Sequence, residues 1–295
     1  MKYSVTHRTT FEYGEPARDN VNEVRLTPLA TASQAPEFFL LNVIPATRVR
    51  TYTDLFSNPV HHFEHVGPHT RLVIESRSTV SVGPRVDYAD LPYGIDHAAL
   101  PKLRGDEICH PFLQDSTYVS RSPEIWREAI DLQDGSTDVF QTAYNLMAGI
   151  HDSCTYQPGV TDSTTTAQHV FEVKRGVCQD LTHLLLAYCR SLHIPARYVS
   201  GYLWDPGPDA GQELMRGAQA SHAWVEIYLP EHGWLGLDPT NSKVVNEQYI
   251  AIATGRDYED IAPVRGTFYG GGHHRTMHVQ VDVRRIARGE PVVAN

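Results

Sequence analysis

Residues 175–189 have the sequence RGVCQDLTHLLLAYC, in which a cysteine stands at the start of a helical pattern. Residues 174–176, Lys-Arg-Gly, are typical of the basic last turn and glycine cap of a preceding short helix, so a new helix is expected to begin near Cys178. Spacings of three and four residues place one set of side chains on a single face, and Pro195 ends the helix. That face consists of Cys178, Leu181, Leu185, Tyr188 and Leu192.

A thiol at this position suits nucleophilic chemistry. The unpaired N–H groups and the dipole at a helix N-terminus favour a negative sulfur, which lowers a cysteine pKa below its free value of about 8.5. The same N–H groups can hold an oxyanion. The alternative is a small buried core cysteine, because free cysteines are among the most buried residues. Only suitably placed partner residues decide between the two.

Length and composition limit the class of protein. A chain of 295 residues with 41% hydrophobic content can bury one large core or, as we expect, two medium ones. The formal net charge of -10 argues against nucleic acid or an anionic membrane as the main partner. Residues 1–8 lack the apolar run of a signal peptide, and no run approaches 18 apolar residues, so we expect a cytoplasmic protein. No pair among its four cysteines forms a CxxC motif.

The pattern along the chain predicts three segments. Residues 1–83 alternate between apolar and polar side chains and are punctuated by turn signals, as in an antiparallel β domain. Residues 84–134 form a connector with a short helix that starts at Ser122-Pro123. Residues 135–295 form the third segment. The predicted fold class is therefore α+β.

Within the third segment helical patterns precede alternating ones. A helix is expected over about 136–151, and Thr165 and Gln168 have the spacing of a capping box for the next short helix. Strands are then predicted at 196–203, 221–229, 234–238, 248–253 and 277–286.

The hairpin of residues 222–238 carries a histidine and an acid on one face. Odd-numbered residues from Ala223 to Leu229 make its apolar face, so His222 and Asp238 share the opposite one. A bend centred on Pro230 places these two residues directly opposite each other, with Cβ atoms roughly 4.5 to 5.5 Å apart. A cysteine at a helix start, a histidine on a strand and an acid on its neighbour are the parts of an activated thiol nucleophile. Taken singly, however, His222 fits an ordinary surface histidine and Asp238 a turn former before a proline.

Four stretches around these residues resemble the transglutaminase-like superfamily of papain-fold cysteine enzymes, in particular its bacterial branch of candidate cysteine proteases. They are RGVCQD (175–180), IPARYVSGY (194–202), SHAWVE (221–226) and GWLGLDPT (233–240). The resemblance covers about residues 135–255, and residues 1–83 look like the β domain that often precedes this core. It implies helices packed on an antiparallel sheet, with Cys178 as nucleophile, His222 as base and Asp238 as its orienting acid.

The resemblance also bears on the reaction. Animal transglutaminases have a tryptophan directly after the nucleophile, whereas this chain has Gln179, and their calcium-binding insertions are not apparent. We therefore expect an amide hydrolase that acts on a peptide or amide substrate and needs no cofactor or metal. An acyltransferase and a non-catalytic peptide-binding protein are the alternatives. The second oxyanion donor is expected to be Tyr156, with Gln179 as a further substrate-binding candidate, although a core tyrosine is an equal alternative.

Two other features have simpler explanations. Asp180 is expected to interact with the N-terminus of its own helix rather than with substrate. The segment His61-His62-Phe63-Glu64-His65 lacks the HExxH spacing, and neighbours on a strand point to opposite faces, so we predict no metal site there. The oligomeric state does not follow from the sequence.

Overall fold

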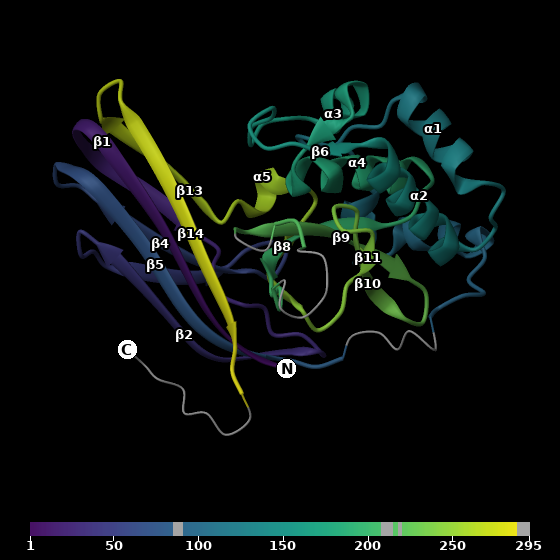
Figure 1. The fold of residues 1–295 in the computed structure, drawn as a ribbon, viewed down its shortest axis with the longest axis horizontal. Coiled ribbons are helices and arrows are strands. Elements are labelled where there is room, and N and C mark those ends of the chain that lie inside the picture. The colour runs from purple at the N-terminus through teal and green to yellow at the C-terminus, as the bar shows by residue number, and fades with distance from the viewer. Residues whose placement is uncertain (85–90, 208–214, 218–219, 288–295) are drawn as a thin grey trace.

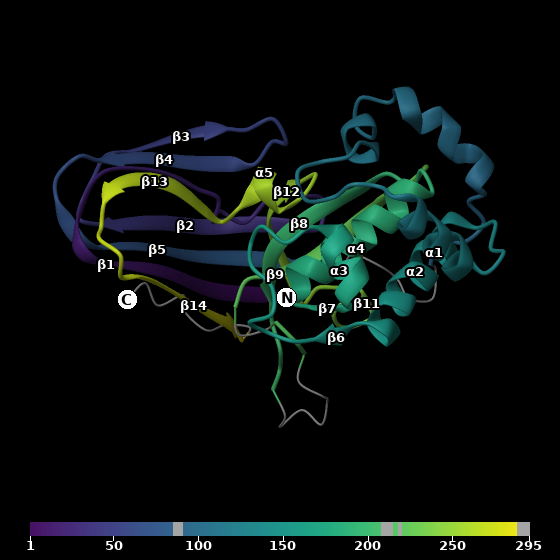
Figure 2. The same cartoon turned by 90° about the horizontal axis from the view of Figure 1, so that it is seen from above.

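The structure, a computed structural model, describes residues 1–84, 91–207, 215–217 and 220–287. Two antiparallel β-sheets and a group of helices make up the molecule. The long strands of the first sheet lie at one end and the helices gather at the other (Figures 1 and 2). The predicted α+β class and N-terminal antiparallel sheet are confirmed.

The first sheet is built around one long strand. Strand β1 pairs over its first half with β5 and β14, and over its second half with β4 and β13. The register with β5 shifts between Glu12 and Ala17, and β1 continues beyond this irregularity to Val24. The strands of this sheet are β1 (Lys2–Val24), β2 (Gln34–Ile44), β3 (Val49–Thr53), β4 (Pro59–His65), β5 (His69–Val82), β13 (Val264–Gly270) and β14 (Arg275–Arg285).

The last two strands correct the predicted domain boundary. We expected residues 135–295 to form one catalytic domain, but β13 and β14 pair with β1 and complete the first sheet. Alternation along a strand identifies its buried face but not its partner, so the prediction for residues 264–285 followed chain order alone. The helices and the second sheet are thus inserted between β5 and β13.

The connector and the first helices follow the first five strands. Two short 3₁₀ helices, η1 (His97–Gly105) and η2 (His110–Leu113), precede α1 (Pro123–Gln133) and α2 (Val139–Ser153). Ser122 caps α1 as predicted, because its hydroxyl accepts a hydrogen bond from the N–H of Ile125 over 3.2 Å. The apolar faces of the two helices are only partly covered, since Trp126, Ile130 and Tyr144 are 48%, 37% and 37% exposed.

The caps of the next helix differ from the prediction. Helix α3 (Ala167–Val173) begins one residue later than expected, since Thr166 rather than Thr165 accepts the capping bond. It ends at Lys174, which takes the left-handed conformation that we had assigned to Gly176. Residues Arg175–Gly176 instead form β7, which pairs in parallel with β6 (Thr155–Tyr156).

Helix α4 (Cys178–Ser191) lies on the second sheet and is buried along most of its length. Its side chains share a core with Ala223, Val225, Ile227 and Leu229, which is the strand face that the alternation predicted. The second sheet has the order β11-β10-β9-β8-β12. Its strands are β8 (Ala196–Leu203), β9 (His222–Leu229), β10 (Gly233–Asp238), β11 (Lys243–Val244) and β12 (Tyr249–Gly255).

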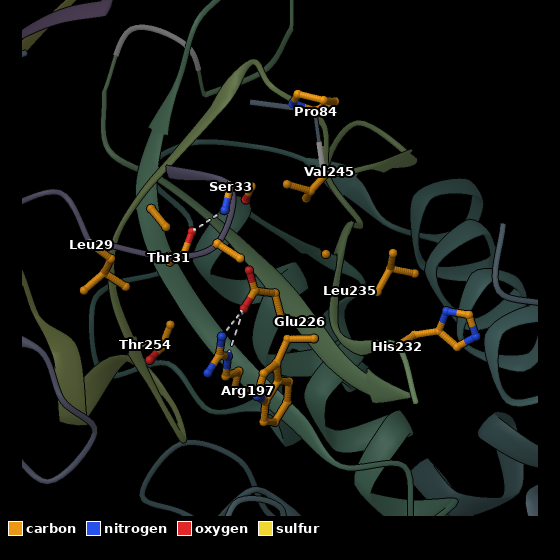
Figure 3. A pocket seen from close by; sticks show the side chains of 14 residues that line it. Leu29, Thr31, Ser33, Pro84, Arg197, Glu226, His232, Leu235, Val245 and Thr254 are labelled. Atoms are coloured by element: carbon orange, nitrogen blue, oxygen red, sulfur yellow. Dashed lines mark hydrogen bonds and ion pairs between the residues drawn. The ribbon is translucent and has the colours of Figure 1, made fainter. Parts of the chain in front are cut away.

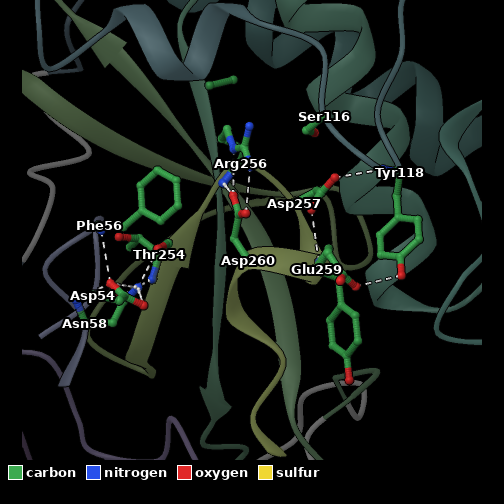
Figure 4. A network of polar contacts seen from close by, with 12 residues as sticks. Asp54, Phe56, Asn58, Ser116, Tyr118, Thr254, Arg256, Asp257, Glu259 and Asp260 are labelled. Carbon is green, nitrogen blue, oxygen red and sulfur yellow. Dashed lines mark hydrogen bonds and ion pairs between the residues drawn. The ribbon is translucent and has the colours of Figure 1, made fainter. Parts of the chain in front are cut away.

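The two sheets share side chains and polar contacts. Tyr202, Ile250 and Ile252 of β8 and β12 belong to the core of the first sheet. A polar network continues this contact (Figure 4). Asn58, before β4, exchanges hydrogen bonds with the backbone of Thr254. Beyond it, Asp257 at the start of α5 (Tyr258–Ile261) accepts from the N–H groups of Tyr118 and Glu259.

Candidate active site

Cys178 is the first residue of α4, and its N-terminus is held by Asp180. Oδ2 of Asp180 accepts hydrogen bonds from the N–H of Val177 over 2.7 Å and from the hydroxyl of Thr161 over 2.6 Å. This is the helix-terminus contact that the sequence predicted for Asp180. The thiol is partly exposed, whereas the carboxylate beneath it is fully buried. Position and exposure therefore suit a nucleophile whose backbone is fixed.

The β9–β10 hairpin has a different register from the predicted one. Tyr228 pairs with Trp234 rather than with His232, a slip of two residues, because the bend is longer than we assumed. A slip of two keeps every side chain on its predicted face. His222 and Asp238 are therefore diagonal neighbours rather than directly opposite ones. Diagonal neighbours on adjacent strands are still within reach of each other when their side chains are long.

The slip does not separate the histidine from the acid. Nε2 of His222 lies 2.8 Å from Oδ2 of Asp238, and both side chains are buried. Nδ1 of the same ring has no hydrogen-bond partner among the described residues. The thiol of Cys178 is close enough to this ring to influence its pKa. The structure thus brings together the three residues that the sequence singled out.

Asp238 has further partners that the sequence did not indicate. Its Oδ2 also accepts from the hydroxyl of Tyr249 over 2.9 Å and from the side-chain amide of Asn241 over 2.8 Å. Its Oδ1 accepts from the backbone N–H groups of Thr240 and Asn241. A carboxylate with so many donors is held in one orientation and in its ionised form.

The charges of the pair outweigh the cost of burying them. Burial alone lowers the pKa of His222, but the charge and hydrogen bond of Asp238, together with Cys178, raise it from 6.5 to about 10. Burial likewise raises the pKa of Asp238, yet the charge of His222 and the hydrogen bonds around the carboxylate bring it below 3.8. An imidazolium is therefore favoured next to the thiol at neutral pH.

Tyr156 lies beside Cys178. It pairs with Gly176 in the β6–β7 ladder, and burial followed by the charge of Cys178 raises the pKa of its phenol to about 12. Its hydroxyl therefore stays protonated and able to donate. Gln179 points elsewhere, since its amide donates to the carbonyl of Ser163 over 3.3 Å.

A turn at Arg216 and Gly217 lies against the ring of His222. Gly217 packs against this ring so closely that a Cβ added to it would lie 2.4 Å from Nδ1. Asn241 binds both backbone polar groups of Arg216, the residue before Gly217. Its Oδ1 accepts a hydrogen bond from the Arg216 N–H, and its side-chain amide donates one to the Arg216 carbonyl. Short-range pattern could not reveal the contact between Asn241 and Arg216, because these residues are 25 positions apart in the sequence.

The other cysteines differ from Cys178. Cys109, Cys154 and Cys189 are buried, and burial raises the pKa of each thiol, to about 12 for Cys109 and Cys189. Thiols in such surroundings are poor nucleophiles. Within the described ranges no group of three or more His, Cys, Asp and Glu side chains could hold a metal ion.

A separate cavity of about 450 Å³ lies on the second sheet (Figure 3). Arg197 and Glu226 meet in it through a 2.6 Å ion pair. Its described lining does not include any member of the Cys178, His222 and Asp238 set. None of the helices in the described ranges has the length and hydrophobicity needed to cross a bilayer.

Comparison with known proteins gives consistent matches along the chain. Residues 129–239 match the transglutaminase-like superfamily, and residues 3–81 match the bacterial transglutaminase-like N-terminal region. An uncharacterised protein of Mycobacterium tuberculosis is 33% identical over 298 residues, which is 96% of this chain and 92% of that protein. A protein-glutamine gamma-glutamyltransferase of Pseudomonas aeruginosa is 35% identical over 121 residues, 40% of this chain and 18% of that protein.

Among solved structures, a candidate cysteine protease from Cytophaga hutchinsonii has a similar fold. Its TM-score is 0.76 over 97% of this chain and 92% of that chain. The sequence identity is 24%, so this similarity supports the fold alone. The papain-like architecture expected for the helices and the second sheet is confirmed by this match.

Proposed function

The chain belongs to the transglutaminase-like superfamily, and from this premise we propose that it is a thiol-dependent amide hydrolase. Cys178 is the nucleophile, His222 the general base and Asp238 the residue that orients the ring. The observation that carries the proposal is the buried 2.8 Å contact between His222 Nε2 and Asp238 Oδ2, which leaves Nδ1 for the thiol. A base held by an acid and turned toward a nucleophile is the general arrangement of such sites.

The first half-reaction starts from an ion pair, in which Nδ1 of His222 holds the proton of the Cys178 thiol, and the thiolate attacks the carbonyl carbon of an amide. The oxyanion that forms is stabilised by the backbone N–H of Cys178, at the positive end of α4, and by the hydroxyl of Tyr156. His222 then gives its proton to the leaving nitrogen. The C–N bond breaks, an amine is released and a thioester remains on Cys178.

In the second half-reaction water replaces the amine. Nδ1 of His222 accepts one proton of the attacking water, whose oxygen adds to the thioester carbonyl. The C–S bond breaks, the carboxylic acid leaves, and the proton held by His222 returns the site to its starting state. Asp238 keeps Nε2 protonated throughout, so that Nδ1 alone exchanges protons.

Acyl transfer to an amine is the second candidate. The similarity to a protein-glutamine gamma-glutamyltransferase over 121 residues favours it. Both reactions share the thioester and differ only in whether water or an amine resolves it. A protein that keeps the site for peptide binding without chemistry is the third candidate, and the intact His222–Asp238 pair speaks against it.

The decisive experiment uses a casein digest in ¹⁸O-labelled water, with and without glycine ethyl ester as a primary amine. Hydrolysis yields product carboxylates that carry ¹⁸O, whereas acyl transfer yields peptides with the mass of the added amine. Cys178→Ala abolishes either product, while Cys154→Ala, which removes a buried thiol, does not. Amine adducts that exceed labelled carboxylates would reverse the ranking. Equal product from the wild type and Cys178→Ala would contradict thiol catalysis.

A further inference from the structure

Arg216 places a positive charge at the border of the proposed active site. Its guanidinium lies 5.8 Å from the ring centroid of Tyr156, within the range of a cation–π contact. The charge of Cys178 raises the pKa of the Tyr156 phenol and the charge of Arg216 lowers it, so both groups lie near Tyr156. The Arg216 side chain is exposed and faces solvent at this point.

The backbone of Arg216 is tied to the His222–Asp238 pair. Asn241 accepts from the Arg216 N–H over 2.9 Å, donates to the Arg216 carbonyl over 3.2 Å and donates to Asp238 over 2.8 Å. One side chain therefore links the turn to the acid of the site. The adjacent Gly217 lies against Nδ1 of His222, the atom that exchanges protons in the proposed reaction. Arg216 is thus the sequence neighbour of the residue that packs against the ring of His222.

No acidic side chain among the described residues neutralises the charge of Arg216. Arg216 makes no ion pair with any residue in the described ranges. A second cation, Lys243, contacts Sδ of the neighbouring Met215 over 3.3 Å. Two acids in the described ranges have other partners: Asp205 accepts hydrogen bonds from the backbone N–H groups of Gly207 and Met215, and Asp238 contacts His222.

We infer that Arg216 forms a subsite for a carboxylate of the substrate, so that the enzyme acts on amides whose acyl side carries an acidic group close to the scissile bond, as in an acidic peptide. This inference rests on the proposed function and adds the substrate class. A guanidinium presents a planar set of donors that matches a carboxylate with two parallel hydrogen bonds. Stacking on Tyr156 and fixation by Asn241 reduce the conformational freedom that Arg216 would lose on binding.

The test compares two alkylating probes of similar size, anionic iodoacetate and neutral iodoacetamide. The rate of modification of Cys178 with each probe is measured by peptide mass spectrometry at low salt. The ratio of the iodoacetate rate to the iodoacetamide rate is expected to fall about fivefold in Arg216→Gln, the effect of about one unit charge at an exposed site. In Arg216→Lys this ratio should stay close to the wild-type value. In Arg50→Gln, which removes an exposed arginine of β3, it should equal the wild-type value.

A protection assay tests the substrate class directly. N-acetylglutamate should protect Cys178 of the wild type from iodoacetamide better than its neutral diamide does, and this difference should shrink in Arg216→Gln. Preferential labelling of Cys178 with an unchanged probe ratio and equal protection would overturn the carboxylate subsite while leaving the proposed function intact. Slow, uniform labelling of all four cysteines in the wild type would instead overturn the proposed function.

Discussion

The hydroxyl of Tyr249 donates a hydrogen bond to Oδ2 of Asp238 over 2.9 Å, although Tyr249 lies on β12 and Asp238 on β10. Strands β8 and β9 separate these two strands in the sheet. The acid of the proposed triad is therefore supported from the far edge of the sheet, and its position depends on how all five strands pack.

Replacing this tyrosine tests that support. Tyr249→Phe removes a hydrogen bond to a buried charged group, and such bonds contribute about 1.5–3 kcal/mol. We expect kcat/KM for amide hydrolysis to fall about tenfold or more, because Asp238 would lose one of the contacts that hold its carboxylate in place against His222. Tyr202→Phe is the matched control, since it removes a buried hydroxyl that bonds His7 instead. Equal losses of rate in both variants would show a general effect of packing.

The buried pair predicts how stability depends on pH. The pKa of His222 in the folded state is about 10 and its ordinary value is 6.5. Its stabilising contribution is therefore complete below pH 6.5 and is lost as the pH rises toward 10. We expect the wild-type Tm to fall between these values by at least about 3 °C more than that of His222→Gln.

His7 provides the control for this experiment. It is also buried, but burial lowers its pKa to about 4, so it does not titrate above pH 6.5. His7→Gln should keep the wild-type decrease of Tm between pH 6.5 and 10. A decrease of the same size in His222→Gln would mean that other groups cause it.

Asp180 is expected to position the nucleophile without taking part in chemistry. Asp180→Ala leaves the N–H of Val177 and the hydroxyl of Thr161 without their acceptor, which costs about 1–3 kcal/mol of unfolding free energy per buried group. The rate of Cys178 alkylation should fall as well, because the start of α4 loosens. Thr161→Val removes only one of the two contacts and should retain more of the rate. An unchanged alkylation rate in Asp180→Ala would exclude a positioning role.

Replacement of Arg190, which lies outside the proposed active site, is expected to lower the free energy of unfolding strongly. It is fully buried on α4 and donates to Ser116 Oγ and to the backbone carbonyls of Ala196 and Arg256. Arg190→Met leaves these acceptors unpaired, and we expect a loss of about 3 kcal/mol or more in urea unfolding. Arg127→Met on the exposed side of α1 should change stability by less than about 0.5 kcal/mol. Similar effects of the two substitutions would contradict this assignment.

Local patterns were sufficient for much of the site. The helix that begins at Cys178, the strand Ala196–Leu203 and the shared face of His222 and Asp238 each follow from periodicity within about fifteen residues. The assignment of side chains to the two faces of a strand is a robust prediction. It remained correct although the predicted hairpin register was wrong by two residues.

Contacts between distant segments were not predictable in the same way. Tyr249 and Asn241 look like an ordinary strand residue and an ordinary loop residue, and only the packed sheet brings them to Asp238. The pairing of β14 with β1 joins residues about 270 positions apart, for which one sequence contains no pairing signal. The exposure of an apolar helix residue such as Trp126 likewise depends on which distant segments cover that helix.

The central position of β1 has a consequence for biosynthesis. Among the strands of the described chain β1 is made first, yet one of its two edges is paired by β13 and β14, which are made last. That edge stays open while the helices and the second sheet emerge, and open strand edges invite pairing with other chains. Synthesis of β13 and β14, rather than of β1 itself, therefore sets the earliest moment at which the first sheet can close.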